Sequence, residues 1–340
     1  MRNLRSKKKI LDTHISELMK SASVPGLSIF IAEGGSEEIR AFGVRSIETG
    51  ALVNSATVFE AASLSKPVVA HVALQLADDG KLDLDEPLSR LAGPLVPLDP
   101  ASATITARHV LSHTTGLPNW RHSDVPLRTY FPPGSRFSYS GEGFVYLQSA
   151  LESLAGDPLD VIVRRRVFEP LGMRSSSFIW RDSFNDNAAF GHDREGNIED
   201  KFKPDRANAA FSLHTTAGDY GKFVVAAMDG ALLSERAARL WMEPQVPTPN
   251  GRFEALESTP PDTETGVYWG LGWGLEPDVK TFFHWGANPG MTSFVLATPA
   301  GRNAFVAFMN SDLGLNIVPG IVERIMPGQH PALSWLGLSR

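Results

Sequence analysis

Cysteine is missing from this 340-residue sequence. Without a thiol, the chain forms no disulfide, has no cysteine nucleophile and offers no thiolate ligand to a metal. Long apolar runs are missing as well, because no segment approaches the roughly 18 consecutive apolar residues of a membrane-spanning helix. We therefore expect a soluble protein.

Positive charge is scarce. The 32 lysine and arginine residues are outnumbered by 38 aspartate and glutamate residues, which gives a net charge of −6. Proteins that bind nucleic acid or an anionic membrane surface carry a basic excess, so we expect neither partner. A composition of 42% hydrophobic and 21% charged residues is that of a globular protein with one extended core or two lobes.

An apolar segment is also missing after the charged start of the chain. Residues 1–9 are basic, as in a secretory signal peptide, but Ile10 and Leu11 are followed at once by polar residues from Asp12 onward. A signal peptide would continue with an apolar stretch of about 7 to 15 residues. We expect a cytoplasmic protein; a periplasmic or secreted one would require a leader upstream of this sequence.

No Gly-x-Ser-x-Gly elbow is present, which argues against an α/β-hydrolase.

Ser63 and Lys66, however, are three residues apart at the start of a predicted helix, where their side chains share a face. A serine hydroxyl needs an adjacent base to become a nucleophile, and lysine can be that base only if its pKa is lowered. The spacing alone also fits a helix-capping serine beside a surface lysine, as Ser6 and Lys9 illustrate.

The apolar pattern predicts a helix, a β-hairpin and a second helix in the first 80 residues. The first helix covers 10–19. Strands at 27–32 and 39–44 follow, and the second helix runs over 63–80. Pro67 is compatible with the first turn of that helix.

Strand patterns are scarce from residue 82 to about 210, where we predict a mainly helical lobe. Beyond it the predicted strands cover 268–275, 281–285, 292–297 and 304–309, and a short helix covers 315–325. The glycines at 270, 272 and 274 would share one face of their strand and allow a neighbour to approach closely.

Four segments, in order along the chain, carry a resemblance to a known family. They are 59–66 (FEAASLSK), 105–118 (ITARHVLSHTTGLP), 133–141 (PGSRFSYSG) and 284–286 (HWG). Together they resemble the serine β-lactamase and DD-peptidase superfamily, specifically the branch of class C β-lactamases, related peptidases and family VIII carboxylesterases. The third segment stands where the family carries Tyr-x-Asn. The fourth stands where it carries Lys-Thr-Gly, His-x-Gly or Trp-x-Gly.

The resemblance covers roughly residues 25–312 and implies an α/β (α+β) fold of the β-lactamase and transpeptidase type. An antiparallel sheet flanked by helices would be formed by residues 1–62 and 212–340. Residues 63–211 would form the mainly helical lobe, with the active site between the two parts. Neither a cofactor nor a metal is implied.

The resemblance also implies roles for single residues. Ser63 would attack a carbonyl and become acylated, with Lys66 as its proton-relay partner. Tyr139 would be a second base whose pKa is lowered by the lysine; it would protonate the leaving group and later activate water. The backbone N–H groups of Ser63 and Ala287 would form an oxyanion hole.

Further roles fall on the fourth segment. His284 would hydrogen-bond near the nucleophile or to a substrate carboxylate, and Gly286 would leave room for the substrate. Trp285, with Trp120 and Trp269, is a candidate for lining an acyl pocket, although tryptophans equally belong to cores and rims.

Two departures from the family pattern favour an esterase or a peptidase-like hydrolase. Gly141 replaces the asparagine that follows tyrosine by two, and His284 replaces a lysine that would meet a β-lactam carboxylate. We expect a serine hydrolase acting on small carboxylic esters or amides, by hydrolysis or by transfer to an alcohol. A β-lactamase or D-amino-acid peptidase is the alternative. A penicillin-binding or scaffold protein without turnover is the third possibility, although it would be expected to lack Lys66 or Tyr139. The oligomeric state is left open.

Two other patterns have competing explanations. His109 and His113 have a spacing that can bind zinc, but without a nearby acidic ligand we expect structural hydrogen bonds instead. Glu142 is a candidate base for deacylation, but on a regular backbone its side chain would point away from Tyr139.

Overall fold

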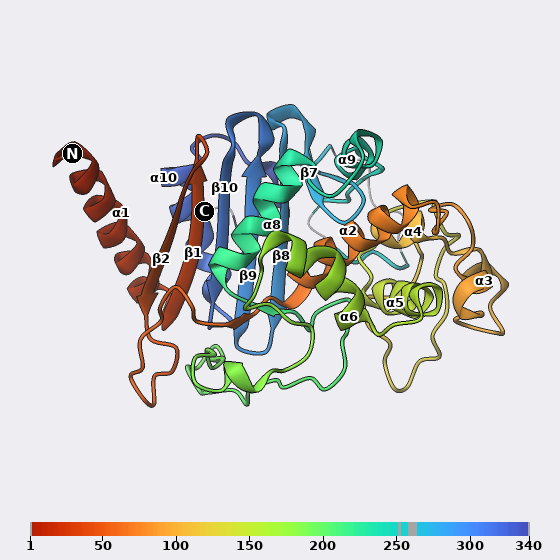
Figure 1. The fold of residues 1–340 in the computed structure, drawn as a ribbon, viewed down its shortest axis with the longest axis horizontal. Helices are drawn as coiled ribbons and strands as arrows, with labels where there is room; N and C mark the ends of the chain where they lie inside the picture. Colours follow the sequence, from red (N-terminus) through yellow and green to blue (C-terminus); the bar gives the residue numbers. More distant parts are fainter. Residues whose placement is uncertain (1, 251–252, 258–263, 339–340) are drawn as a thin grey trace.

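A computed structural model describes residues 2–250, 253–257 and 264–338 of the chain. Within these residues, eight strands form one antiparallel sheet in the order β2-β1-β10-β9-β8-β7-β6-β5 (Figure 1). The strands are β1 (Gly26–Glu33), β2 (Ser36–Gly43), β5 (Val246–Pro247), β6 (Tyr268–Trp269), β7 (Gly274–Glu276), β8 (Thr281–Asn288), β9 (Met291–Thr298) and β10 (Asn303–Met309). A separate pair joins β3 (Phe59–Glu60) to β4 (His214–Thr215).

The sheet brings the two ends of the chain together. β1 pairs with β10 in a register that places Leu27 opposite Met309 and Ala32 opposite Ala304. The inner strands β9 and β10 are almost entirely buried, which explains their apolar sequences, whereas no residue of the edge strand β2 is fully buried and its sequence mixes polar with apolar residues. The N-terminal hairpin is thus an integral part of the C-terminal sheet.

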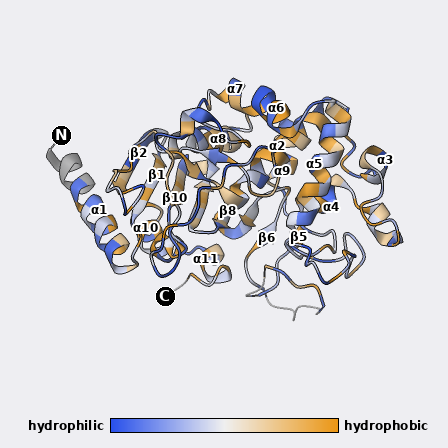
Figure 2. Cartoon of the chain, turned by 90° about the horizontal axis from the view of Figure 1, so that it is seen from below, coloured by the Kyte–Doolittle hydropathy of each residue, from blue (hydrophilic) through white to orange (hydrophobic). Residues whose placement is uncertain are grey.

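Helices cover both faces of this sheet (Figure 2). α1 (Arg2–Ser21), α10 (Val318–Ile325) and α11 (Pro331–Trp335) belong to one face, where Ile15 of α1 shares a core with Ile321 of α10. On the other face α8 (Ala217–Asp229) packs on β1 and β10, and α2 (Ser65–Asp78) extends the same core. No helix of the described residues combines the length and apolarity needed to cross a membrane.

Beside the sheet, the chain forms further helices, most of them short, joined by long loops (Figure 1). They are α3 (Ser89–Ala92), α4 (Ala107–Leu111), α5 (Gly141–Ala155), α6 (Leu159–Val163) and α7 (Glu169–Leu171), and α9 (Glu235–Trp241) follows α8. The longest of them, α5, is capped by Ser140, whose side chain accepts the N–H of Gly143. It ends at Gly156 in the left-handed conformation.

The predicted antiparallel sheet with flanking helices is present, and most predicted elements are found within a few residues of their expected bounds. The segment 268–275 is an exception. It is not one strand but a hairpin, in which β6 and β7 pair with each other on either side of a turn. Gly272 has a φ of +101° in this turn, and a Cβ there would lie 2.5 Å from the Cβ of Ala70. The close approach expected of these glycines is therefore made by a turn onto α2. The division of the chain into two domains stays a prediction.

Candidate active site

Ser63 lies in a short 3-10 turn, η1 (Ala62–Leu64), that leads directly into α2. Ser65 Oγ donates a hydrogen bond to the carbonyl oxygen of Ala62 at 2.7 Å and holds the turn closed. Ala62 has a φ of +49°, in the left-handed region that costs a non-glycine residue about 1 kcal/mol or more. The packing around the turn therefore maintains a strained backbone next to the nucleophile candidate.

Lys66 follows Ser63 by three residues and is buried. Its Nζ lies 2.9 Å from Ser63 Oγ and donates to the carbonyl oxygen of Ala210 at 2.8 Å. Burial lowers the pKa of Lys66 well below its ordinary value of 10.5, because the charged ammonium loses its hydration. The alternative of a capping serine beside a surface lysine is wrong, since no side chain caps α2 and Lys66 belongs to the interior.

Tyr139 precedes α5 and completes the group. Its ring centre lies 4.8 Å from Lys66 Nζ, and its buried hydroxyl, although next to Ser63, makes no hydrogen bond of regular geometry. Burial raises the pKa of the phenol well above its ordinary value of 10, and the neighbouring Ser63 hydroxyl offsets this only in part. The expected lowering of the tyrosine pKa is therefore wrong for the resting protein. Desolvation outweighs the attraction of a lysine that burial itself tends to neutralise.

Two buried histidines pack around Tyr139. The ring of His113 stacks on the tyrosine at 4.1 Å between centres, and its Nδ1 accepts the N–H of Ser140 at 3.0 Å. His284 lies 6.2 Å from the tyrosine ring, and its Nδ1 lies 2.7 Å from the carbonyl oxygen and 2.9 Å from the backbone nitrogen of Trp285. Burial lowers the pKa of both histidines, that of His284 to about 3, so both are neutral near pH 7.

His284 lies behind the wall of the cleft. Its side chain is fully buried, and in the described structure it does not line the cleft next to Ser63. It packs against Tyr139 and Trp285 from the interior, and the hydrogen bond expected of it near the nucleophile or to a substrate carboxylate stays a prediction.

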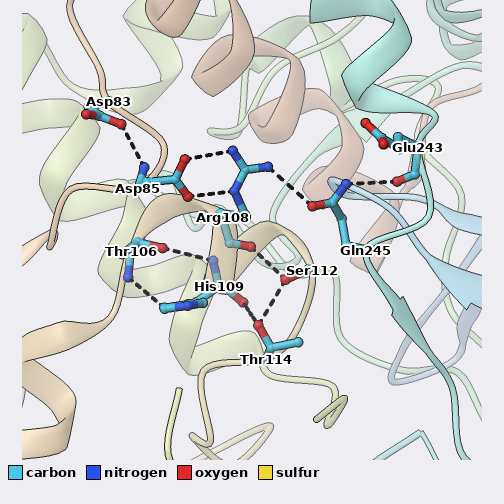
Figure 3. A network of polar contacts seen from close by, with 9 residues as sticks. All are labelled: Asp83, Asp85, Thr106, Arg108, His109, Ser112, Thr114, Glu243 and Gln245. Carbon is cyan, nitrogen blue, oxygen red and sulfur yellow. Dashed lines mark hydrogen bonds and ion pairs between the residues drawn. The ribbon is translucent and has the colours of Figure 1, made fainter. Parts of the chain in front are cut away.

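A polar network anchors the segment that leads to His113 (Figure 3). Arg108 forms a two-point ion pair with Asp85 and donates to Gln245, which ties α4 to the residues before β5. Thr106 and His109 cap the start of α4 reciprocally, each side chain accepting the backbone N–H of the other residue. His109 is thus a structural hydrogen bonder, as expected.

The edge of β8 passes close to the nucleophile turn. β7 pairs with β8 only as far as Phe283, so the backbone beyond it has β9 on one side and η1 on the other. The N–H of Trp285 points to the imidazole of His284 and not to β9. Because backbone groups alternate in direction along a strand, the N–H of Ala287 points to that same edge, toward η1.

Gly286 is required at this crossing for a reason that differs from the expected one. A Cβ at position 286 would lie 2.7 Å from Ala61 O, 2.8 Å from Ser63 N and 2.5 Å from Ser293 Oγ. The missing side chain therefore lets β8 approach the nucleophile turn; it does not simply leave room for a substrate. Ser293 Oγ donates to Ala61 O at 2.8 Å and fixes the same contact.

A cleft of about 470 Å³ opens over Ser63. It is lined by Ser63, Asn119, Trp120, Tyr139, Phe211, Phe253, Trp285, Ala287, Asn288 and Pro289. Among the described residues that line it, none carries a charged side chain, and most of the wall is aromatic or amide. Trp120 and Trp285 line the cleft as proposed from the sequence, whereas Trp269 is buried against His113 and Tyr139.

Several residues of this site were not predicted. The carbonyl oxygen of Ala210, the rings of Phe211 and Phe253, and the amides of Asn119 and Asn288 lie outside the four segments, although Asn119 follows the second segment directly and Asn288 is the last residue of β8. Only the fold brings them there. One polar neighbour lies behind the cleft: Glu60 accepts a hydrogen bond from Asn288 Nδ2 at 2.7 Å.

Glu142 is engaged elsewhere. Its buried carboxylate forms an ion pair with Arg121 and also accepts the backbone N–H of Arg121 at 3.0 Å. The carboxylate is therefore committed to the loop before α5 and not directed at Tyr139.

Comparison with known proteins agrees with this geometry. The chain is 28% identical over 332 residues to penicillin-binding protein 4 of Amycolatopsis lactamdurans, covering 89% of this chain and 85% of that protein. It is 23% identical to protein flp of Staphylococcus aureus (strain MRSA252) over 93% of this chain, but spans only 65% of that protein's length. Its fold matches that of D-alanine carboxypeptidase AmpC from Burkholderia cenocepacia with a TM-score of 0.78 and 20% identity, over 95% of this chain and 99% of that one.

The predicted resemblance and the predicted fold class are thereby confirmed. The model of the Beta-lactamase family matches residues 11–318, a span that includes the nucleophile turn, the Tyr139 segment and β8. Because that match extends over nearly the whole chain, the protein belongs to the Beta-lactamase family, whose fold is that of serine hydrolases.

Proposed function

We propose that the protein is a serine hydrolase that cleaves small, uncharged carboxylic esters or amides through an acyl-enzyme on Ser63. The observation that carries the proposal is the 2.9 Å contact between Lys66 Nζ and Ser63 Oγ. It joins a buried lysine, whose pKa is lowered, to a hydroxyl that opens into a cleft. A neutral amine at this distance is a competent base for the serine proton.

The proposed acylation transfers one proton around the site. Lys66 takes the proton of Ser63 as Oγ bonds to the substrate carbonyl carbon. Tyr139, which burial keeps protonated, gives its proton to the leaving alcohol or amine as the scissile bond breaks, and the lysine then returns a proton to the tyrosine. Deacylation runs the same transfers in reverse: the lysine takes the tyrosine proton, and the tyrosinate takes a proton from the water that attacks the acyl carbon. The lysine then returns its proton to Ser63 Oγ as the acid is released.

The oxyanion of both tetrahedral intermediates would be bound by the backbone N–H groups of Ser63 and Ala287. Position 286 must be glycine for these two segments to approach, as the contacts of its absent Cβ indicate. Each donor of this kind contributes about 3 to 4 kcal/mol to transition-state stabilisation.

The cleft favours esters over β-lactams within this chemistry. β-Lactams and peptides ending in a D-amino acid carry a carboxylate, and an enzyme that selects them gains from a cation at the site. The described residues that line this cleft supply none, and His284 is a buried neutral imidazole.

The test is steady-state turnover of p-nitrophenyl acetate, p-nitrophenyl butyrate and the cephalosporin nitrocefin by the wild type and by Ser63→Ala. We expect ester turnover that is lost in Ser63→Ala and little hydrolysis of nitrocefin. Ser149→Ala, an exposed serine on α5, is the matched control. Wild-type activity in Ser63→Ala would refute the mechanism, and faster turnover of nitrocefin than of the esters would show a β-lactamase instead.

A further inference from the structure

The space beside the first residue of α5 is filled from another part of the chain. Gly141 has no side chain, and a Cβ there would lie 2.7 Å from Cζ2 and 2.8 Å from Cη2 of Trp120. The indole of Trp120 thus occupies the volume that any side chain at position 141 would need. Position 141 must therefore be glycine for Trp120 to occupy its place in the cleft wall.

Trp120 is held in this place by both of its neighbours. The carbonyl oxygen of Asn119 accepts the N–H groups of Gly141 and Glu142, at 3.0 and 3.1 Å. On the other side, Arg121 donates its backbone N–H and its guanidinium to the Glu142 carboxylate. Although 39% of Trp120 is exposed, its backbone is clamped to the first turn of α5. The ring is therefore a built part of the cleft and not a loose surface side chain.

The aromatic lining of the cleft divides into two walls. Trp120 contacts Phe211 edge to face at 5.5 Å between ring centres. Tyr139, Trp285 and Phe253 form the other wall, with ring centres 5.3 to 6.2 Å apart. Within the described residues no ring contact joins the two walls, so the cleft offers two separate apolar surfaces beside Ser63.

We propose that the Trp120–Phe211 wall binds the acyl group of the substrate, and that the enzyme prefers esters of flat, uncharged, aromatic acids. This inference rests on the proposed function, in which Tyr139 protonates the leaving group. The leaving group then lies at the Tyr139 wall, which leaves the other wall for the acyl group. A flat ring gains both burial and edge or face contact against Trp120 and Phe211, whereas an acetyl group reaches neither.

The test varies the acyl group while the leaving group stays p-nitrophenol. The readout is the ratio of kcat/KM for p-nitrophenyl phenylacetate to that for p-nitrophenyl acetate. We expect a ratio well above one in the wild type, a ratio about tenfold lower in Trp120→Ala, and partial recovery in Trp120→Phe. Trp180→Ala, which removes a tryptophan that does not line the cleft, should keep the wild-type ratio. An unchanged ratio in Trp120→Ala overturns the proposal.

A double-mutant cycle tests the packing of Trp120 against position 141, on which the proposed acyl wall depends. Gly141→Ala should lower the ratio in the wild type by displacing the indole, and should have no further effect in Trp120→Ala, where the space is vacant. Equal effects of Gly141→Ala in both backgrounds would show that the two residues do not share this volume.

Binding measurements separate failure of this inference from failure of the proposed function. Calorimetric titration of Ser63→Ala with the two esters reports contact with the wall and needs no turnover. Tighter binding of the phenylacetate that is lost in Ser63→Ala/Trp120→Ala supports the acyl wall even if Ser63 were not the nucleophile. Equal binding of the two esters contradicts the wall while leaving a Ser63-dependent esterase intact.

Discussion

At the scale of single residues, burial sets the protonation of the site. It acts in opposite senses on the two groups next to Ser63, lowering the pKa of Lys66 and raising that of Tyr139. Both shifts favour the neutral forms, because an ion in this interior would lack hydration. In the proposed mechanism a neutral amine is the base and a neutral phenol is the acid of acylation, so the dry environment would prepare both groups before substrate binds.

Glu60 provides a residue-scale prediction about pH. Burial raises its pKa from 4.5 to about 7, although Asn288 and the backbone of Phe202 oppose the shift. Between pH 4.5 and 7 the folded protein therefore holds a proton that the unfolded chain releases, and its stability falls as pH rises through this window. Glu60→Gln keeps an acceptor for Asn288 but lacks the ionisation. It should be more stable than wild type above pH 7, by up to about 3 kcal/mol, with no such gain below pH 4.5.

Urea unfolding at a series of pH values measures this difference. Glu37→Gln, at an exposed position of β2, is the matched control and should show no comparable pH dependence. A gain for Glu60→Gln that is the same at pH 4 and pH 8 would mean that the Glu60 carboxyl is not the titrating group.

At the scale of elements, the site depends on the crossing of β8 and η1. Gly286→Ala would force a methyl group against Ala61 O and Ser63 N, both backbone atoms with little freedom to move. We expect a loss of about 1 to 3 kcal/mol in the free energy of unfolding. We also expect kcat to fall at least about a hundredfold, because the displaced N–H of Ser63 no longer meets the oxyanion.

The control for this variant is Gly143→Ala. Position 143 lies within α5, and the nearest atom to an added Cβ is a threonine methyl at 3.3 Å, so helix propensity should offset mild crowding. Chemical unfolding and ester turnover of both variants give the comparison. Full activity in Gly286→Ala would contradict the role assigned to this crossing.

At the scale of the whole molecule, two cores on opposite faces of one sheet hold the site in place. The core under α1 and α10 contains Ile15, which is fully buried, although α1 itself lies at the β2 edge of the sheet, away from β8 (Figure 1). Although the same core extends to Tyr139, we expect a change at its α1 end to lower stability without altering the site.

Ile15→Ala should lower the free energy of unfolding by about 2 to 5 kcal/mol, through lost burial and the cavity left behind. Turnover per folded molecule should be retained, because no active-site residue lies on α1. Ile10→Ala, at a position that is 64% exposed, should change stability by no more than about 0.5 kcal/mol. Denaturant midpoints, with active-site titration of the folded fraction, measure both quantities. A loss of turnover equal to the loss of stability would show that α1 is coupled to the site.

Local sequence was enough to predict the features that depend only on residues close together in the chain. The spacing of Ser63 and Lys66 brings the two side chains together within one turn, and apolar periodicity identified the N-terminal helix, the first hairpin and the strands β8 to β10. The segment 268–275 was mispredicted because its alternating apolar and glycine residues fit a strand. The same glycines permit the turn that the chain makes.

Tertiary structure alone decided what depends on surroundings. Three features depend on groups that are tens to hundreds of residues apart in the sequence. They are the direction of the Tyr139 pKa shift, the burial of His284 and the ring contact between Trp120 and Phe211. Desolvation and shape are properties of the packed interior, and no local pattern encodes them. The sequence by itself therefore determined the family and the catalytic candidates, whereas the packed fold decided their protonation and the shape of the cleft.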